Sequence, residues 1–236
     1  MPTRPTILLA LILALFALPS PALAQRQWLT GDPTPLRYEI AVTPDAEAGS
    51  FTGEARIIVE NVAALSGITM NALDLEIASA RIDNAGAAFA LDSEAQTLTL
   101  TPRRPLAPGR HTIRIVYRGK IFDDAYGLFR VSYEAGGQTK RALATQFEVG
   151  DARRLAPMWD QPNRRAVFSL TVTAPTGQMV ISNMPAQQVT RVAGGKSRTR
   201  FADTPSMSSY LLFLAVGDFE RVTRDVDGVE LGVVVR

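Results

Sequence analysis

The side chains that most often carry out catalysis are scarce in this chain. It contains no cysteine and a single histidine, His111, among its 236 residues. A catalytic zinc ion is normally held by several histidine or cysteine side chains, so this chain cannot build such a site by itself. Disulfides, thiolate metal sites and a cysteine nucleophile are excluded for the same reason. A calcium or magnesium site made only of carboxylates stays open, although no spaced Asp/Asn/Gly loop is present.

Arrangements for metal-free hydrolysis find little support. A Ser-His-Asp triad would need His111, which lies in an alternating, strand-like run, and the chain has no G-x-S-x-G nucleophile elbow. A lone histidine in a strand is usually structural. Carboxylate pairs such as Asp123 with Asp124, or Asp151 with Asp160, could in principle act on glycosidic bonds. Adjacent aspartates more often cap turns, so their spacing alone does not indicate a glycosidase.

The segment Gly195-Lys196-Ser197 looks like the end of a phosphate-binding loop. That motif needs an earlier glycine, and the corresponding position holds Thr190. Because the glycines of 193–196 separate two β-branched runs, the segment is better interpreted as a hairpin turn.

Overall composition fits an ordinary globular protein. Hydrophobic residues make up 46% and charged residues 20%, and the formal net charge is only +2. No block of basic residues is longer than a pair. Nucleic-acid binding needs a concentrated cationic face, so we expect no nucleic-acid partner.

The first residues resemble a secretory leader. Arg4 precedes an apolar run over residues 7–18, and Ala22-Leu23-Ala24 forms an A-x-A cleavage site. We therefore predict a signal peptide over 1–24, cleaved after Ala24, and a periplasmic or secreted mature chain. The apolar run of about 12 residues is shorter than the roughly 20 that a membrane span needs, so we expect no span after cleavage.

The remainder, 25–236, is predicted to be one all-β domain. Short alternating or β-branched runs are separated by Gly, Pro, Asn and Asp, which is typical of a sandwich or related fold. A single helical turn is expected near Ala152–Leu155, ended by Pro157. The expected strands are Tyr38–Val42, Phe51–Val59, Leu73–Ile82, Thr97–Leu100, His111–Tyr117, Val167–Thr173, Gln187–Val192, Ser197–Phe201, Tyr210–Val216, Phe219–Asp225 and Val229–Val235.

Residues 141–185 carry a more specific pattern, T-Q-x-E followed by D-A-R-x-x-x-P-x-x-D-x-P, A-x-F and S-N-M-P. The matching positions are Thr145, Gln146, Glu148, Asp151, Ala152, Arg153, Pro157, Asp160, Pro162, Ala166, Phe168, Ser182, Asn183, Met184 and Pro185. The stretch resembles the N-terminal domain of the aminopeptidase N family of zinc metallopeptidases, the gluzincin aminopeptidases. Residues 126–133 and 207–219 resemble further segments of that domain. The chain departs from the pattern at Met158, where many members have cysteine, and at Arg165, where lysine is usual.

The resemblance implies a saddle-shaped, β-sandwich-like domain that packs on a thermolysin-like catalytic domain. That catalytic domain carries H-E-x-x-H and G-A-M-E-N, binds Zn²⁺ and releases residues from peptide N-termini. Neither motif is present here. The resemblance therefore implies that this chain alone binds no zinc and is inactive, although its parent enzyme is a hydrolase.

One pair of site residues is implied by the resemblance. In the family, the acidic or amide residue of T-Q-x-E holds the free α-amine of the substrate, which places Glu148 in that role with Gln146 beside it. A carboxylate facing an ammonium forms a charge-assisted hydrogen bond. The plainer interpretation is a salt bridge between Glu148 and a nearby arginine. Asp151, Arg153 and Asp160 are interpreted as structural supports of this loop.

Other functions remain to be weighed. The domain could stand alone as a secreted binding or interaction module, in which case its docking face should be polar rather than apolar. A carbohydrate-binding sandwich would need an exposed aromatic platform. Aromatic residues make up only 7% of the chain, and one of its two tryptophans, Trp159, lies inside the matched motif.

Overall fold

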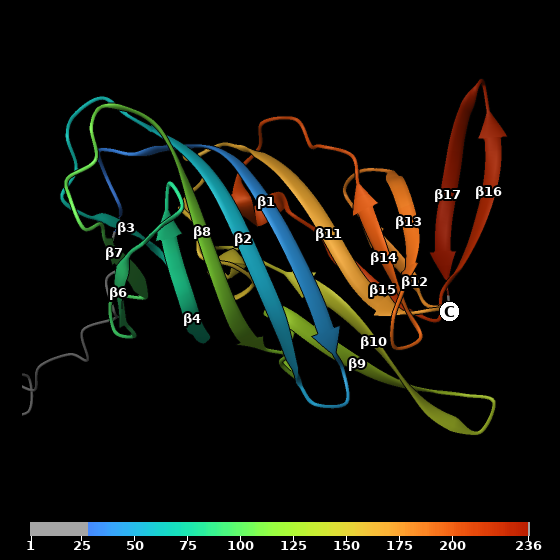
Figure 1. The fold of residues 1–236 in the computed structure, drawn as a ribbon. Helices are drawn as coiled ribbons and strands as arrows, with labels where there is room; N and C mark the ends of the chain where they lie inside the picture. Colours follow the sequence, from blue (N-terminus) through green and yellow to red (C-terminus); the bar gives the residue numbers. More distant parts are fainter. Residues whose placement is uncertain (1–27, 236) are drawn as a thin grey trace, which may run out of the picture.

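The regular structure in the described part of the chain is almost all β-strand, as the sequence predicts. A computed structural model describes residues 28–235, and within them the only helical segments are two short 3-10 turns, η1 (Ala152–Arg154) and η2 (Ser209–Leu211) (Figure 1). The turn η1 falls where a helical turn was expected. The predicted signal peptide, 1–24, lies outside the described residues. Within 28–235 no helix has the length and apolar character needed to cross a bilayer.

An eight-stranded sheet forms the larger layer of the molecule. Its strand order is β13-β14-β11-β1-β2-β8-β4-β5, and only β1 and β11 run parallel. Alternation along the strands sends one set of side chains inward, as with Phe51, Ala55 and Ile57 of β2, and leaves polar residues outside. The bounds are β13 (Ala186–Val192), β14 (Lys196–Phe201), β11 (Val167–Pro175), β1 (Thr34–Asp45), β2 (Ser50–Asn61), β8 (Gly109–Lys120), β4 (Leu75–Ile82) and β5 (Ala85–Gly86).

Two smaller sheets lie against this layer. The order β12-β15-β10-β9 gives a four-stranded sheet whose strands cross behind the large one in Figure 1. One cluster of buried apolar side chains includes Ile57 of the large sheet and Leu128 and Leu143 of the smaller one, so the two sheets share a core as in a β-sandwich. The bounds are β12 (Met179–Ser182), β15 (Leu214–Gly217), β10 (Gln138–Gln146), β9 (Gly127–Ala135), β3 (Ile68–Asn71), β7 (Thr97–Thr101) and β6 (Ala88–Asp92), the last three forming the third sheet.

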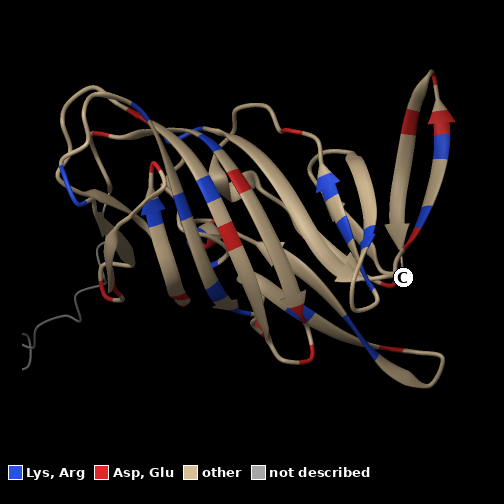
Figure 2. Ribbon diagram, in the orientation of Figure 1, with Lys and Arg blue, Asp and Glu red and all other residues tan. Residues whose placement is uncertain are grey.

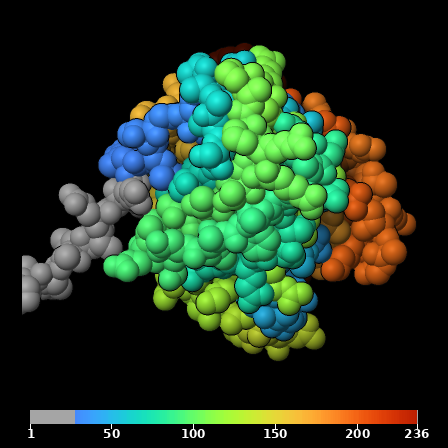
Figure 3. All heavy atoms as spheres, turned by 60° about the vertical axis from the view of Figure 1, so that its left-hand side comes forward, coloured from blue at the N-terminus to red at the C-terminus, as the bar shows by residue number. Residues whose placement is uncertain are grey.

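The solvent-facing side of the large sheet mixes charges of both signs. Figure 2 shows both blue and red bands on β1 and β2, and blue bands alone on the neighbouring β8. Arg56 pairs with Glu39 at 3.0 Å and Arg114 with Glu54 at 3.4 Å, so much of this charge is neutralised locally. Seen from the end where β3, β6 and β7 lie, the segments around 60–110 form one continuous surface (Figure 3).

Two aromatic rings lie over glycines of neighbouring strands in the core of the large sheet. Gly53 of β2 pairs with Tyr117 of β8, and Phe51 pairs with Gly119. A Cβ placed on Gly53 would lie 2.4 Å from the Tyr117 ring, and one on Gly119 would lie 2.2 Å from the Phe51 ring. Both positions therefore need glycine, because the rings occupy the space where a side chain would begin.

The strand predictions hold for most of the expected runs, but the short strands β3, β5, β6 and β12 were not predicted, and two further differences are larger. The segment expected as a strand over Tyr210–Val216 begins as η2 and becomes the strand β15 only at Leu214. The hairpin formed by β9 and β10, which spans Gly127–Gln146, was not predicted at all. The predicted hairpin around 193–196 is confirmed, with Gly194 and Gly195 at φ values of 77° and 67°.

The last described element, the β16–β17 hairpin, stands apart from the core. It consists of β16 (Glu220–Val226) and β17 (Val229–Val235), and Figure 1 shows it projecting away from the other sheets. Every residue of both strands is exposed, including Val222 and Val233, each with 63% of its surface accessible. These two valines face each other across the hairpin. Apolar side chains thus lie in solvent on an element that buries none of its residues against the rest of 28–235.

Candidate functional site

The T-Q-x-E segment ends strand β10 and opens a short loop, residues 147–151, called the Glu148 loop below. Phe147 is buried in the core, whereas Glu148 and Val149 are exposed and joined by a cis peptide bond. The carbonyl oxygen of Phe147 accepts hydrogen bonds from the backbone N–H groups of Gly150 at 2.7 Å and Asp151 at 3.0 Å. The loop is therefore anchored by one core side chain and closed by its own backbone, with Glu148 at its outer side.

The structure brings the two predicted site residues together. The side-chain oxygen of Gln146 accepts a hydrogen bond from the backbone N–H of Glu148 at 2.9 Å. The Glu148 carboxylate itself makes no hydrogen bond or ion pair within residues 28–235. The plainer interpretation, a salt bridge from Glu148 to a nearby arginine, is therefore not found. An exposed carboxylate on a held loop is available to accept hydrogen bonds from a cation.

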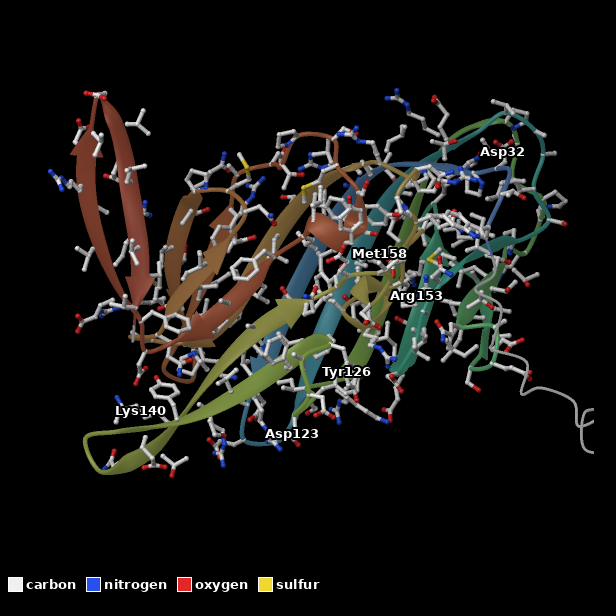
Figure 4. The ribbon with its side chains drawn as sticks, turned by 180° about the vertical axis from the view of Figure 1, so that it is seen from behind. Asp32, Asp123, Tyr126, Lys140, Arg153 and Met158 are labelled. Carbon is white, nitrogen blue, oxygen red and sulfur yellow. The ribbon has the colours of Figure 1, made fainter. Side chains whose placement is uncertain are left out.

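Arg153 and Asp160, two of the predicted structural supports, form a buried ion pair. The Nε atom of Arg153 lies 3.0 Å from an Asp160 carboxylate oxygen, and the two side chains are only 2% and 1% exposed. Arg153 also donates to the side-chain oxygen of Gln96 at 3.0 Å, and Ser209 donates to Asp160 at 2.6 Å. In Figure 4, Arg153 lies in the middle of the molecule beside Met158. This network ties η1 to the β6–β7 turn and to η2.

Asp151, the third predicted support, pairs with a residue that the sequence analysis did not select. Its carboxylate accepts a hydrogen bond from Arg154 Nε at 2.9 Å, and Arg154 also contacts the carboxylate of Asp74. The guanidinium lies over two aromatic rings, 5.3 Å from the centre of Phe122 and 5.0 Å from that of Tyr126. Burial lowers the pKa of Arg154 below its ordinary value. We call Arg154 with these four partners the Arg154 cluster.

Two segments of the family resemblance that are distant in sequence lie side by side at this site. Gly127, the first residue of β9, is paired with Gln146, the last residue of β10. Gly127 has a φ of 62°, and a Cβ placed on it would lie 3.2 Å from side-chain atoms of Arg154 and Phe122. Only glycine combines that backbone conformation with so close an approach. The Y-G-L-F run at 126–129 was a signal in the sequence for this neighbourhood.

His111 takes no part in this site. Its Nδ1 lies 2.5 Å from the Asp83 carboxylate and its Nε2 lies 2.8 Å from the carbonyl oxygen of Ala107. The pair borders a surface cavity of about 430 Å³ that Arg103 and Arg104 also line. Since both ring nitrogens face oxygen acceptors, the ring joins strand β8 to the β4–β5 turn and to the segment before β8, which is a structural role.

The geometry around His111 predicts a pH-dependent contribution to stability. Burial by itself lowers the pKa of the imidazole, but the hydrogen bonds to Asp83 and Ala107 outweigh it, so the pKa is raised above 6.5. The stabilisation is therefore complete below the pKa of the unfolded chain and is lost as the pH rises through the raised pKa of the folded chain. Since the chain has one histidine, its ring protons give a single NMR titration. We expect the wild-type midpoint to lie above 6.5 and to fall in Asp83→Asn. A wild-type midpoint equal to or below that of Asp83→Asn would contradict the assignment.

Among residues 28–235 there is no group of three or more His, Asp or Glu side chains placed to hold a metal ion.

Comparison with known proteins shows the family. Residues 34–211 match the model of the peptidase M1 N-terminal domain. The chain belongs to this family. The M1 N-terminal domain match spans both β9–β10 and the Glu148 loop, and it agrees with the resemblance found in the sequence.

Relatives of the M1 N-terminal domain agree with this assignment. Aminopeptidase N of Acetobacter pasteurianus is 39% identical over 201 residues, which is 84% of this chain and 57% of that protein. Aminopeptidase M1-C of Oryza sativa subsp. japonica is 36% identical over 80% of this chain and 22% of its own length. Aminopeptidase M1 of Arabidopsis thaliana is 33% identical over 84% of this chain and 24% of its own length. This chain thus spans from about a fifth to somewhat over half of the relatives that it matches.

Proposed function

We propose that this chain is the N-terminal domain of an exported zinc aminopeptidase and supplies the carboxylate that holds the substrate's α-amine. The observation that carries the proposal is the Glu148 carboxylate, which is exposed at the end of β10 and has no partner within residues 28–235. Gln146 and the Phe147 carbonyl hold the backbone on either side of it. A carboxylate placed in this way is ready to accept charge-assisted hydrogen bonds from an ammonium group.

This assignment fixes which end of a peptide would be bound. A free N-terminus carries a positive charge near neutral pH, whereas an internal amide does not, so a carboxylate anchor selects chain ends. The substrates would be peptide N-termini. Bond cleavage would depend on Zn²⁺ held by a catalytic domain, where the ion polarises the scissile carbonyl and activates water. This chain's own part would be to bind and orient the amine.

The β16–β17 hairpin supports docking of the domain onto a further one. Its exposed valines and Leu231 form the apolar surface expected at a permanent interface, since such interfaces are apolar at their centre. A stand-alone secreted binding or interaction module, the alternative, is expected to carry a polar surface instead. Export rests on the predicted leader with cleavage after Ala24, which points to the periplasm or the cell exterior.

The test uses the aminopeptidase that contains this domain, with Glu148→Ala and Glu148→Gln. Because a hydrogen bond to a charged group contributes about 1.5–3 kcal/mol, we expect kcat/KM for peptides with a free amine to fall about tenfold to a hundredfold. Glu94→Gln, an exposed carboxylate in the β6–β7 turn, is the matched control and should leave kcat/KM unchanged. Full activity in Glu148→Ala would refute the amine-anchor role.

A further inference from the structure

Two successive arginines of the D-A-R-R segment point to different parts of the molecule. Arg153 is buried against Asp160 in the core, as described above. Arg154 lies nearer the surface, with 19% of its side chain exposed, and takes part in no contact with Asp160. Its contacts reach segments far away in sequence: Asp74 precedes β4, whereas Phe122 and Tyr126 lie between β8 and β9. Arg154 therefore joins three parts of the chain that meet beside the Glu148 loop.

Arg154 has two kinds of partner. Its guanidinium pairs with the carboxylates of Asp151 and Asp74, and it lies over the rings of Phe122 and Tyr126. The two rings are 4.5 Å apart, so they form one aromatic surface. An arginine offers several N–H donors in a fixed plane together with a cation–π contact, so lysine is a poor substitute here.

These contacts hold both ends of the Glu148 loop. At its end, Asp151 donates its backbone N–H to the Phe147 carbonyl, and its carboxylate accepts a hydrogen bond from Arg154. At its start, Gln146 pairs with Gly127, whose backbone lies against the aliphatic part of the Arg154 side chain. The Arg154 side chain thus lies against both Asp151, which closes the loop, and Gly127, which pairs with Gln146 at the start of the loop.

We propose that Arg154 is a positioning residue that fixes the place of Glu148, acting through Asp151 and Gly127. Without Arg154, the carboxylate of Asp151 loses a charge-assisted hydrogen bond at the point where the loop closes. The loop then opens more often, while the core pair Arg153–Asp160 keeps the rest of the fold. The functional part of this inference rests on the proposed role of Glu148, whereas its structural part does not.

The structural part is tested on this chain by amide hydrogen exchange. In Arg154→Met and Arg154→Lys we expect the amides of residues 148–151 to exchange about tenfold to a hundredfold faster, as for loss of a hydrogen bond to a charged group. Amides of β2 and β8 should keep their rates. Arg104→Lys, an exposed arginine in the segment before β8, is the control. Asp151→Asn should reproduce the effect and serves if Arg154→Met fails to fold. Unchanged loop exchange in folded Arg154→Lys and Asp151→Asn would overturn the proposal.

The functional part is tested in the aminopeptidase that contains this domain. Arg154→Lys should raise KM for free-amine peptides several-fold while kcat stays nearly constant, because the amine is bound alike before and during the reaction. In a Glu148→Ala background the same substitution should add no further loss, since both act through one carboxylate. Independent, additive losses would overturn positioning through Glu148. If Glu148→Ala alone has no effect, the amine-anchor role fails, and the exchange rates still decide whether Arg154 holds the loop.

Discussion

Replacing Arg153 by methionine is expected to lower the free energy of unfolding by about 3–5 kcal/mol. The Asp160 carboxylate would then be buried at 1% exposure without the cation that neutralises it. It would keep the hydrogen bonds from the Ser209 hydroxyl and from the backbone N–H of residue 153, but these neutral donors do not replace a guanidinium. The loss is therefore dominated by an uncompensated buried charge and not by the missing contact itself.

Chemical denaturation followed by tryptophan fluorescence measures this change, since Trp159 is next to Asp160 and buried. The double variant Arg153→Met/Asp160→Leu removes both charges and should recover most of the lost stability. Arg110→Met is the surface control. It breaks the ion pair between Arg110 and Glu60, whose side chains are 72% and 48% exposed, and should change the free energy of unfolding little. A loss of under 1 kcal/mol in Arg153→Met, equal to that of the surface control, would contradict the buried-charge explanation.

Phe147→Ala is the second substitution with a large expected effect, about 3–5 kcal/mol of unfolding free energy. The Phe147 side chain is 1% exposed and belongs to the shared core, so its removal leaves a cavity. The same residue accepts the two backbone hydrogen bonds that close the Glu148 loop. Phe147→Ala keeps this carbonyl but removes the side chain that holds it in place, so the substitution affects both the core and the proposed site.

The midpoint of chemical denaturation again gives the measurement. Phe89→Ala, a phenylalanine of β6 with 41% of its surface exposed, is the matched control and should cost much less. Leucine fills most of the volume of the lost ring, so the denaturation midpoint of Phe147→Leu should lie between those of Phe147→Ala and Phe89→Ala. If Phe147→Ala and Phe89→Ala proved equally mild, Phe147 would not be the anchor of the loop.

Much of the fold could be predicted because its signals are local. Alternation in Phe51–Val59 and the glycines of 193–196 identify strands and a turn from neighbouring residues alone. The hairpin β9–β10 escaped prediction because Gly127–Ala135 alternates poorly: most of its residues are partly or fully exposed. The two strands pair with each other, and β10 also pairs with β15, a segment distant in the sequence.

The candidate site shows the same division more sharply. No property of Glu148 in the sequence distinguishes it from other exposed carboxylates, and only the family pattern around it selected the residue. Arg154 was missed because its partners Asp74, Phe122 and Tyr126 are separated from it by tens of residues. A single sequence carries no information on such contacts. In the folded chain, the pairing of Gln146 with Gly127 brings these distant segments together.

The β16–β17 hairpin has a consequence for handling the protein in solution. A two-stranded ribbon has two free edges, and its unpaired N–H and C=O groups can accept a strand from another molecule. Val229–Val235 is rich in β-branched residues and carries one charge, Glu230, which is the composition of segments that stack between chains. Wherever this hairpin is uncovered, self-association is expected to begin there, and to grow with protein concentration rather than with unfolding.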